Sequence, residues 1–164
     1  MQEPNIDPKL LASGGFDPKV ELNDKLLIRQ TGDSLIATID CEKLYHLNNI
    51  HAIAPIEPVN TDGLKYILAI LNSKLMNHYY HLISLEFGRA MAQTDIETLE
   101  LLPIKEAPKE QKEIIVELVN TMLSLNKDRY LPNKEDSIGE IEAKIKETEN
   151  QIDKQICGLY GIEL

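Results

Sequence analysis

Aromatic side chains are scarce in this sequence of 164 residues, which contains no tryptophan and only two phenylalanines. Hydrophobic residues nevertheless make up 43% of the chain, so the core must consist mainly of leucine and isoleucine. A chain of this length can bury such a core in one domain with an appendage, or in two small units. The composition is that of an ordinary globular protein.

Long apolar runs are also missing. No stretch approaches the roughly 18 consecutive apolar residues of a transmembrane helix, so we expect no membrane association. The first residues, MQEPNIDPKL, have neither the basic start nor the apolar stretch of a secretory signal. Cys41 and Cys157 are far apart and form no CxxC or Cys/His pattern, which predicts two reduced thiols in a cytoplasmic protein.

The usual motifs of catalysis are missing as well. The sequence has no Gly-rich phosphate loop, no nucleophile elbow and no zinc-binding spacing. His78 and His81 have an i,i+3 spacing that lets two ligands share one helix face, but no third ligand accompanies them. We therefore expect no catalytic residue, no metal and no cofactor in this segment, and interpret it as a binding or assembly unit.

An excess of positive charge is absent too. Residues 1–105 carry 9 basic and 14 acidic side chains and residues 106–164 carry 8 and 13, so each part has a net charge of −5. This balance works against a simple nucleic-acid-binding protein, in which a basic face supplies the affinity. The window 63–94 differs, because it holds Lys65, Lys74 and Arg89 against the single acidic residue Glu86.

Three sections are predicted along the chain. Residues 1–24, rich in proline and glycine, indicate an irregular lead-in from a longer protein. Residues 25–105 are typical of a small mixed or antiparallel sheet covered by short helices, and residues 106–164 are purely helical. Together these sections predict an α+β fold with a C-terminal helical hairpin.

The predicted strands come first in the folded part. KLLIRQ and LIATID are β-prone runs on either side of TGDS, in which Gly32 can supply a positive φ, so they predict a hairpin. EKLYHL and IHAIAPI are expected to add further strands, the latter ending where Pro55 and Pro58 forbid central pairing. Residues 89–104 have the length for a strand, a turn and another short segment.

Two short helices are predicted to meet at the stretch ILAILNSKL. Thr61 or Asp62 can serve as the N-cap of the first helix. Asn72 tolerates the left-handed conformation that ends helices, and Ser73 can cap a new amino terminus. We predict a helix–helix corner here, with a second helix that buries three residues: Leu75, Tyr79 and Leu82.

The C-terminal section predicts two longer helices. Pro108 suits the first helical position, and a stripe follows it: Ile114, Ile115, Leu118, Val119, Met122 and Leu125. Ser137 and Glu140 form a capping box for the second helix. Its seam recurs every seven residues, at Ile138, Ile145, Ile152 and Leu159, with Ile141, Thr148 and Gln155 between them. We predict an antiparallel, coiled-coil-like hairpin.

Several of these passages have a family resemblance. KLLIRQTGDSLIATID resembles the hairpin of the TaqI-like C-terminal specificity domain of restriction–modification methyltransferases, which include single-chain type IIG enzymes. YILAILNSKLMNHYYHLIS is similar to the helix corner of that family and of target recognition domains in type I specificity subunits. LELLPIKEAPKEQKEIIVELVNTML and QIDKQICGLYGI resemble the junction and the closing motif of type IIG chains, so the resemblance runs from about residue 25 to the end.

The resemblance implies a target recognition domain, residues 25–105, that binds double-stranded DNA and is not catalytic by itself. In that family an upstream methyltransferase domain of the same chain binds S-adenosylmethionine and modifies an adenine base that is flipped out of the duplex. Endonuclease activity of the parent enzyme, with Mg²⁺, is a further expectation. This segment has neither the Gly-rich loop nor the NPPY-type motif of such a domain.

Seven residues are predicted to contact DNA: Lys74, Arg89, Gln93, Thr94, Arg29, Gln30 and His78. Lysine and arginine suit phosphate or guanine, and glutamine and threonine suit base edges. Arg29 and Gln30 of the hairpin are second choices. The acidic C-terminal helices are expected to face away from the duplex.

A second hypothesis stays open. The seam of the last helix suits pairing with another chain, including a second copy, so the segment is alternatively a protein-interaction module. An NPPY-type motif in the upstream reading frame would favour the DNA-recognition hypothesis over this one.

Overall fold

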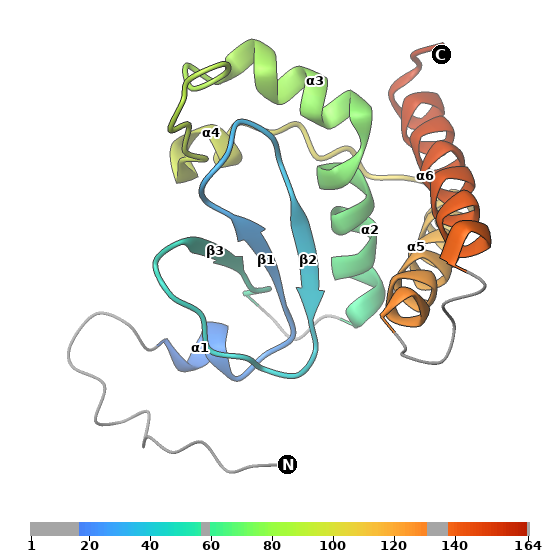
Figure 1. Cartoon of the computed structure of the whole chain (residues 1–164), viewed down its shortest axis with the longest axis horizontal. Coiled ribbons are helices and arrows are strands. Elements are labelled where there is room, and N and C mark those ends of the chain that lie inside the picture. Colours follow the sequence, from blue (N-terminus) through green and yellow to red (C-terminus); the bar gives the residue numbers. More distant parts are fainter. Residues whose placement is uncertain (1–16, 57–59, 131–137, 164) are drawn as a thin grey trace.

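The computed structural model describes residues 17–56, 60–130 and 138–163 (Figure 1). Its sheet contains β1 (Lys25–Arg29), β2 (Ala37–Asp40) and β3 (Ile50–Ile53) in the order β2-β1-β3. Both pairings are antiparallel, and Ile28 lies opposite Ala37 in β2 and His51 in β3. The predicted hairpin is confirmed, and a one-turn helix, α1 (Pro18–Glu21), precedes it.

EKLYHL, predicted as a strand, is irregular, which corrects that expectation. The Asp40 carboxylate accepts hydrogen bonds from the backbone N–H groups of Glu42 (2.9 Å) and Leu44 (2.8 Å). These bonds turn the chain away from the sheet directly after β2. Lys43, between the two donors, has a φ of 59°, which an extended strand does not allow.

A buried ionic cluster lies where β1 begins. Lys25 is fully buried, and its Nζ lies 3.0 Å from Asp40 Oδ2 and 3.5 Å from Glu21 Oε2. Burial acts to raise the pKa of Asp40, but hydrogen bonds from Lys25 and two backbone N–H groups outweigh it and lower this pKa below its ordinary value. The cluster joins α1 to both strands of the hairpin.

The predicted corner joins α2 (Thr61–Asn72) to α3 (Lys74–Ile83), and Ser73 makes the break. Ser73 has extended backbone angles, and its Oγ accepts from Met76 N and donates to Ile70 O. Asn72 is the last residue of α2 and does not adopt the left-handed conformation, contrary to our expectation. Asn60, rather than Thr61 or Asp62, caps α2.

The buried face of α3 differs from the predicted one. Met76 and Tyr80 are buried, whereas Leu82 is 70% exposed and Leu75 and Tyr79 are partly buried. The start of the helix at Ser73 sets the phase of its faces, and sequence spacing alone did not determine that phase. The segment after α3 contains α4 (Ile96–Glu100) and an isolated bridge, in place of the predicted strand.

The C-terminal hairpin consists of α5 (Lys109–Arg129) and α6 (Ile138–Tyr160). Gln111, early in α5, donates to Gln155 O, late in α6, and Arg129 at the end of α5 pairs with Glu142 early in α6. These contacts confirm the antiparallel arrangement. Pro108 is the N-cap of α5 rather than its first residue, and Ser137 of the predicted capping box lies outside the described residues.

The predicted seams of the hairpin need correction. Ile114 of α5 is 50% exposed and Val116 is buried instead. In α6, Ile138 is exposed and Ile145 is only partly buried, whereas a broader face is buried: Ile141, Thr148, Ile152, Asp153, Ile156, Cys157 and Leu159. The face is broader than a heptad seam because α6 packs against α2 and α3 as well as α5.

The linker before α5 is held from two sides. Tyr66 of α2 donates a hydrogen bond of 2.6 Å to Lys105 O, and Lys105 Nζ donates one of 2.7 Å to Leu159 O. The Tyr160 hydroxyl accepts from Lys105 N and donates to Pro103 O. The closing LYGI stretch therefore contacts the junction that leads into the hairpin.

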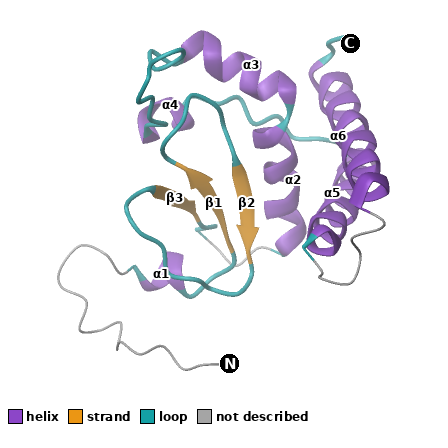
Figure 2. Ribbon diagram, viewed as in Figure 1, coloured by secondary structure: helices purple, strands orange, loops and turns teal. Residues whose placement is uncertain are grey.

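One hydrophobic cluster runs through the sheet, α2, α3, α5 and α6. Figures 1 and 2 show the layers: the sheet lies on one side of α2, and the hairpin lies on the other. The α+β class is confirmed. No helix in the described part of the chain is both long enough and apolar enough to cross a membrane.

Candidate nucleic-acid interface

The β1–β2 turn lies against the segment that follows α3. Thr31 and Gln93 form an antiparallel bridge. On either side of it, Gly32 N donates to Ala92 O (2.9 Å) and Thr94 N donates to Gln30 O (2.7 Å). The predicted residues Gln30, Gln93 and Thr94 are thus brought together at one end of the sheet.

Gly32 gives this turn its shape. Its φ of 139° lies in the region that favours glycine. A Cβ at this position would lie 2.3 Å from Nη2 of Arg29, so the Arg29 guanidinium packs directly over the glycine. Arg29 ends β1 and is exposed, and it is therefore accessible beside the bridge.

Glu86 connects Arg89 to the Thr31–Gln93 bridge. Its Oε1 pairs with Arg89 Nη1, and its Oε2 accepts a hydrogen bond of 3.4 Å from Gln93 N. Arg89 remains 61% exposed and Gln93 is exposed. We call Arg29, Gln30, Glu86, Arg89 and Gln93 the loop edge.

Thr94 and His51 hold the loop edge against the sheet. Thr94 is fully buried, so its side chain lies beneath the surface. His51 of β3 donates from Nε2 to Thr94 O at 2.7 Å and ties the segment to the sheet. Sequence reasoning missed His51, and no local pattern indicates this contact; Glu86 could have been found as the single acidic residue of the window 63–94.

His81 joins α3 to the same region. Its ring lies 4.2 Å from the Phe87 ring, and its Nε2 lies 3.3 Å from Ser34 Oγ in the β1–β2 turn. His78, the other histidine of the pair, is exposed on α3. Within residues 17–56, 60–130 and 138–163, no three histidine, cysteine or acidic side chains cluster closely enough to hold a metal ion.

Lys74 is placed elsewhere. It begins α3 beside α6, where its Nζ lies 2.9 Å from Asp153 Oδ2 and its backbone N–H donates to Asp153 Oδ1. The hydrogen bond to Asp153 raises the pKa of Lys74. Arg89 follows the other end of α3, a helix of ten residues and thus about 15 Å long. The structure does not bring Lys74 and Arg89 together.

The arrangement defines a class: a small antiparallel α+β domain that presents two exposed loops at one end of its sheet and carries a helical hairpin behind it. The chain belongs to the family of TaqI-like C-terminal specificity domains, whose pattern matches residues 8–104, more than half of its length. The match ends before α5, so the hairpin lies outside it. No curated protein matches the chain.

Proposed function

We propose that this chain is the DNA sequence-recognition part of a type IIG-like restriction–modification methyltransferase, and that its loop edge contacts the duplex. The Thr31–Gln93 bridge carries this proposal, because it joins two exposed loops into one surface in a member of a specificity-domain family. The chain itself is not catalytic in this proposal.

The side chains of the loop edge suit the grooves of DNA. Arg29 and Arg89 can donate two hydrogen bonds to guanine O6 and N7 or bind phosphates, and Gln93 can pair with adenine N6 and N7. Glu86 holds Arg89 in the free protein, and guanine or phosphate would replace the carboxylate on binding. Gln30 is partly buried and contributes mainly through its backbone.

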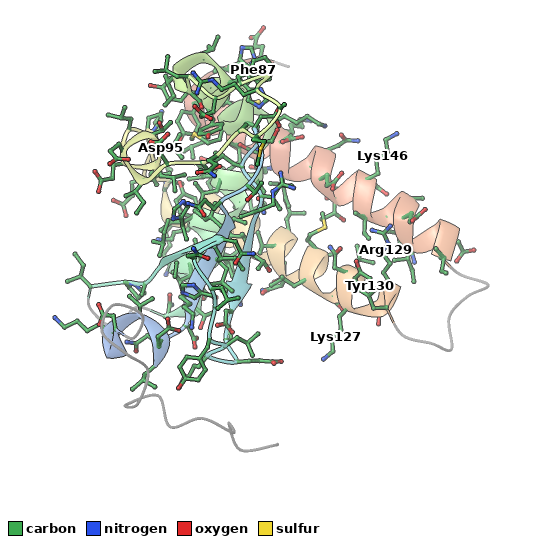
Figure 3. All side chains as sticks on the ribbon, turned by 60° about the vertical axis from the view of Figure 1, so that its left-hand side comes forward. Phe87, Asp95, Lys127, Arg129, Tyr130 and Lys146 are labelled. Carbon is green, nitrogen blue, oxygen red and sulfur yellow. The ribbon has the colours of Figure 1, made fainter. Side chains whose placement is uncertain are left out.

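The remaining predicted contacts take other roles in this proposal. Thr94 supports the loop edge from inside, Lys74 holds α6, and His78 is an outlying contact on the exposed face of α3. Figure 3 shows Phe87 and Asp95, which flank the loop edge, well away from Lys127 and Lys146 on the hairpin. The acidic hairpin would then face away from the duplex, which limits its repulsion.

Catalysis belongs to another part of the parent enzyme in this proposal. An upstream methyltransferase domain would bind S-adenosylmethionine, flip the target adenine and close on the opposite side of the duplex. Cleavage of DNA with Mg²⁺ by the parent enzyme, and a cytoplasmic location, are parts of the same proposal.

Binding to duplex DNA tests the proposal. We expect R29A/R89A to bind a pool of random duplexes at low salt about thirtyfold more weakly than wild type, with a shallower salt dependence. The control K127A/K146A removes the same charge from the hairpin and should change affinity by less than about twofold. Equal losses in the two variants, or none in R29A/R89A, would refute the assignment of the loop edge.

A further inference from the structure

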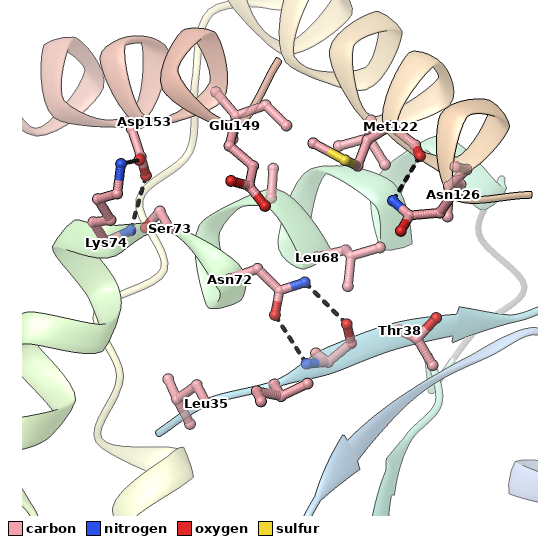
Figure 4. A pocket seen from close by; sticks show the side chains of 16 residues that line it. Leu35, Thr38, Leu68, Asn72, Ser73, Lys74, Met122, Asn126, Glu149 and Asp153 are labelled. Carbon is pink, nitrogen blue, oxygen red and sulfur yellow. Dashed lines mark hydrogen bonds and ion pairs between the residues drawn. The ribbon is translucent and has the colours of Figure 1, made fainter. Parts of the chain in front are cut away.

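Two asparagines bind the backbone at the start of β2 and just before it, on an outer edge of the sheet. β2 is an outer strand, and strands of this kind usually leave a row of backbone groups unpaired. Asn72 accepts a hydrogen bond from Ala37 N (2.9 Å) and donates one to Ala37 O (2.9 Å), as Figure 4 shows. Asn77 accepts from Leu35 N (2.8 Å) and donates to Leu35 O (3.4 Å).

These two contacts follow the alternation of an antiparallel strand. Arg29 N donates to Ile36 O, so Ile36 faces β1. In such a ladder alternate residues direct both backbone groups to the same side. Leu35 and Ala37 therefore face outward, and each asparagine amide pairs with one outward residue as a neighbouring strand would.

The helix corner brings the two amides to the strand. Ser73 ends α2 and starts α3, so Asn72 lies on the last turn of one helix and Asn77 on the first turns of the next. Asn77 Nδ2 also lies 3.3 Å from Leu71 O and 3.3 Å from Ser73 O, which orients its amide. A continuous helix would place these side chains five residues apart on different faces.

We propose that Asn72 and Asn77 are positioning residues for DNA sequence discrimination, because they hold the β1–β2 turn in the shape that presents the loop edge. Leu35 ends this turn, Gly32 within it donates to Ala92, and Arg29 packs over Gly32. The DNA-related part of this inference depends on the proposed function. We call the four hydrogen bonds from Asn72 to Ala37 and from Asn77 to Leu35 the clamp, and its existence does not depend on the proposed function.

Amide hydrogen exchange tests the clamp. In N77A the Leu35 amide should exchange about tenfold faster, and in N72A the Ala37 amide should do so, which corresponds to a hydrogen bond of about 1.4 kcal/mol. N126A is the matched control: Asn126 belongs to α5 and donates to Met122 O within that helix. It should leave both amides within about twofold. Unchanged Leu35 and Ala37 rates in N77A and N72A would overturn the inference.

Selection from a pool of duplexes with a randomised central stretch tests the consequence. N72A/N77A should lose about tenfold of the wild-type preference for its selected sequence, while total binding at low salt stays within about threefold. Wild-type preference in the double variant would overturn the positioning role. If wild type selects no sequence, the proposed function and its DNA-related part fail, and hydrogen exchange decides the clamp separately.

Discussion

The two ends of α3 carry similar ion pairs in different surroundings. At the first turn, Asp153 is almost fully buried and binds both the Lys74 ammonium and its backbone N–H. Beyond the other end, Glu86 and Arg89 pair across a loop, and Arg89 is 61% exposed. Both cations come from the same locally basic window of the sequence. Both cations are exposed, Lys74 to 71%, so the contrast lies in their partners: Asp153 belongs to α6 and joins two parts of the fold, whereas Glu86 and Arg89 belong to one loop.

A still more buried pair extends this contrast and should give the largest effect. K25M leaves Glu21 and Asp40 buried without their cation, so we expect the free energy of unfolding to fall by about 3–5 kcal/mol. Urea denaturation measures it. K109M, which removes an exposed pair with Glu113, should change stability by less than about 0.5 kcal/mol. Similar values for the two variants would contradict the assigned role of burial.

Removing Asp153 sharpens the comparison next. D153A removes the acceptor of the first N–H of α3 and the contact that joins α6 to the corner, so the free energy of unfolding should fall by about 1–3 kcal/mol. E86A is the counterpart at the other end of α3, and it should lower the free energy of unfolding by less than about 1 kcal/mol. Urea denaturation compares the two variants. The contrast breaks down if E86A is the more damaging change.

Duplex affinity should depend more on the Arg89 end of α3 than on the Lys74 end, which is the reverse of the order expected for stability. R89A should weaken binding to random duplexes about tenfold, because Arg89 lies at the loop edge. K74A removes the same charge from a lysine held by Asp153 and should weaken binding less than about threefold. Gel-shift titrations at low salt measure both affinities. A loss in K74A as large as in R89A would place the interface at the other end of α3.

Glu86 should restrain binding slightly. E86Q removes the carboxylate that holds Arg89 and repels phosphate, so duplex affinity should rise about two- to threefold at low salt. The control E149Q makes the same change on α6, beside Lys74, and should have less effect. Lower affinity in E86Q would mean that the carboxylate orients Arg89 for DNA.

Alkaline pH provides the smallest test. The pKa of Lys74 is raised in the folded protein, so its pair contributes stability below the unfolded-state pKa and loses it as pH rises through the folded pKa. The stability difference between wild type and K74M should therefore shrink at strongly alkaline pH. Urea midpoints at neutral and alkaline pH measure the difference, and a constant value would contradict the assignment.

Local patterns predicted much of the fold. The TGDS turn between two apolar runs, the break at Ser73 and the two long helices involve neighbouring residues, so short-range rules apply to them. The strand prediction for EKLYHL was wrong because the Asp40 carboxylate binds backbone N–H groups after β2 and turns the chain. The exposed position of Leu82 and the broad face of α6 also depend on distant packing partners.

The candidate site was predictable as a set of residues but not as a surface. Arginine and glutamine near the hairpin and after Gly88 were candidates from their chemistry alone. Their proximity depends on the Thr31–Gln93 bridge and on His51, which no sequence spacing indicates. No sequence pattern indicates the edge contacts of Asn72 and Asn77, since the sequence predicts for Asn72 only a role in ending a helix.

By itself the sequence determined the kinds of elements, the corner and the α+β class, because turn formation, capping and amphipathic periodicity act within a few residues. The tertiary structure decided which acidic partner each cation meets: Lys74 pairs with Asp153, 79 residues further along the chain, whereas Arg89 pairs with Glu86 at the loop edge. The physical reason is that electrostatic and hydrogen-bond energies depend on distance in space, whatever the separation in sequence.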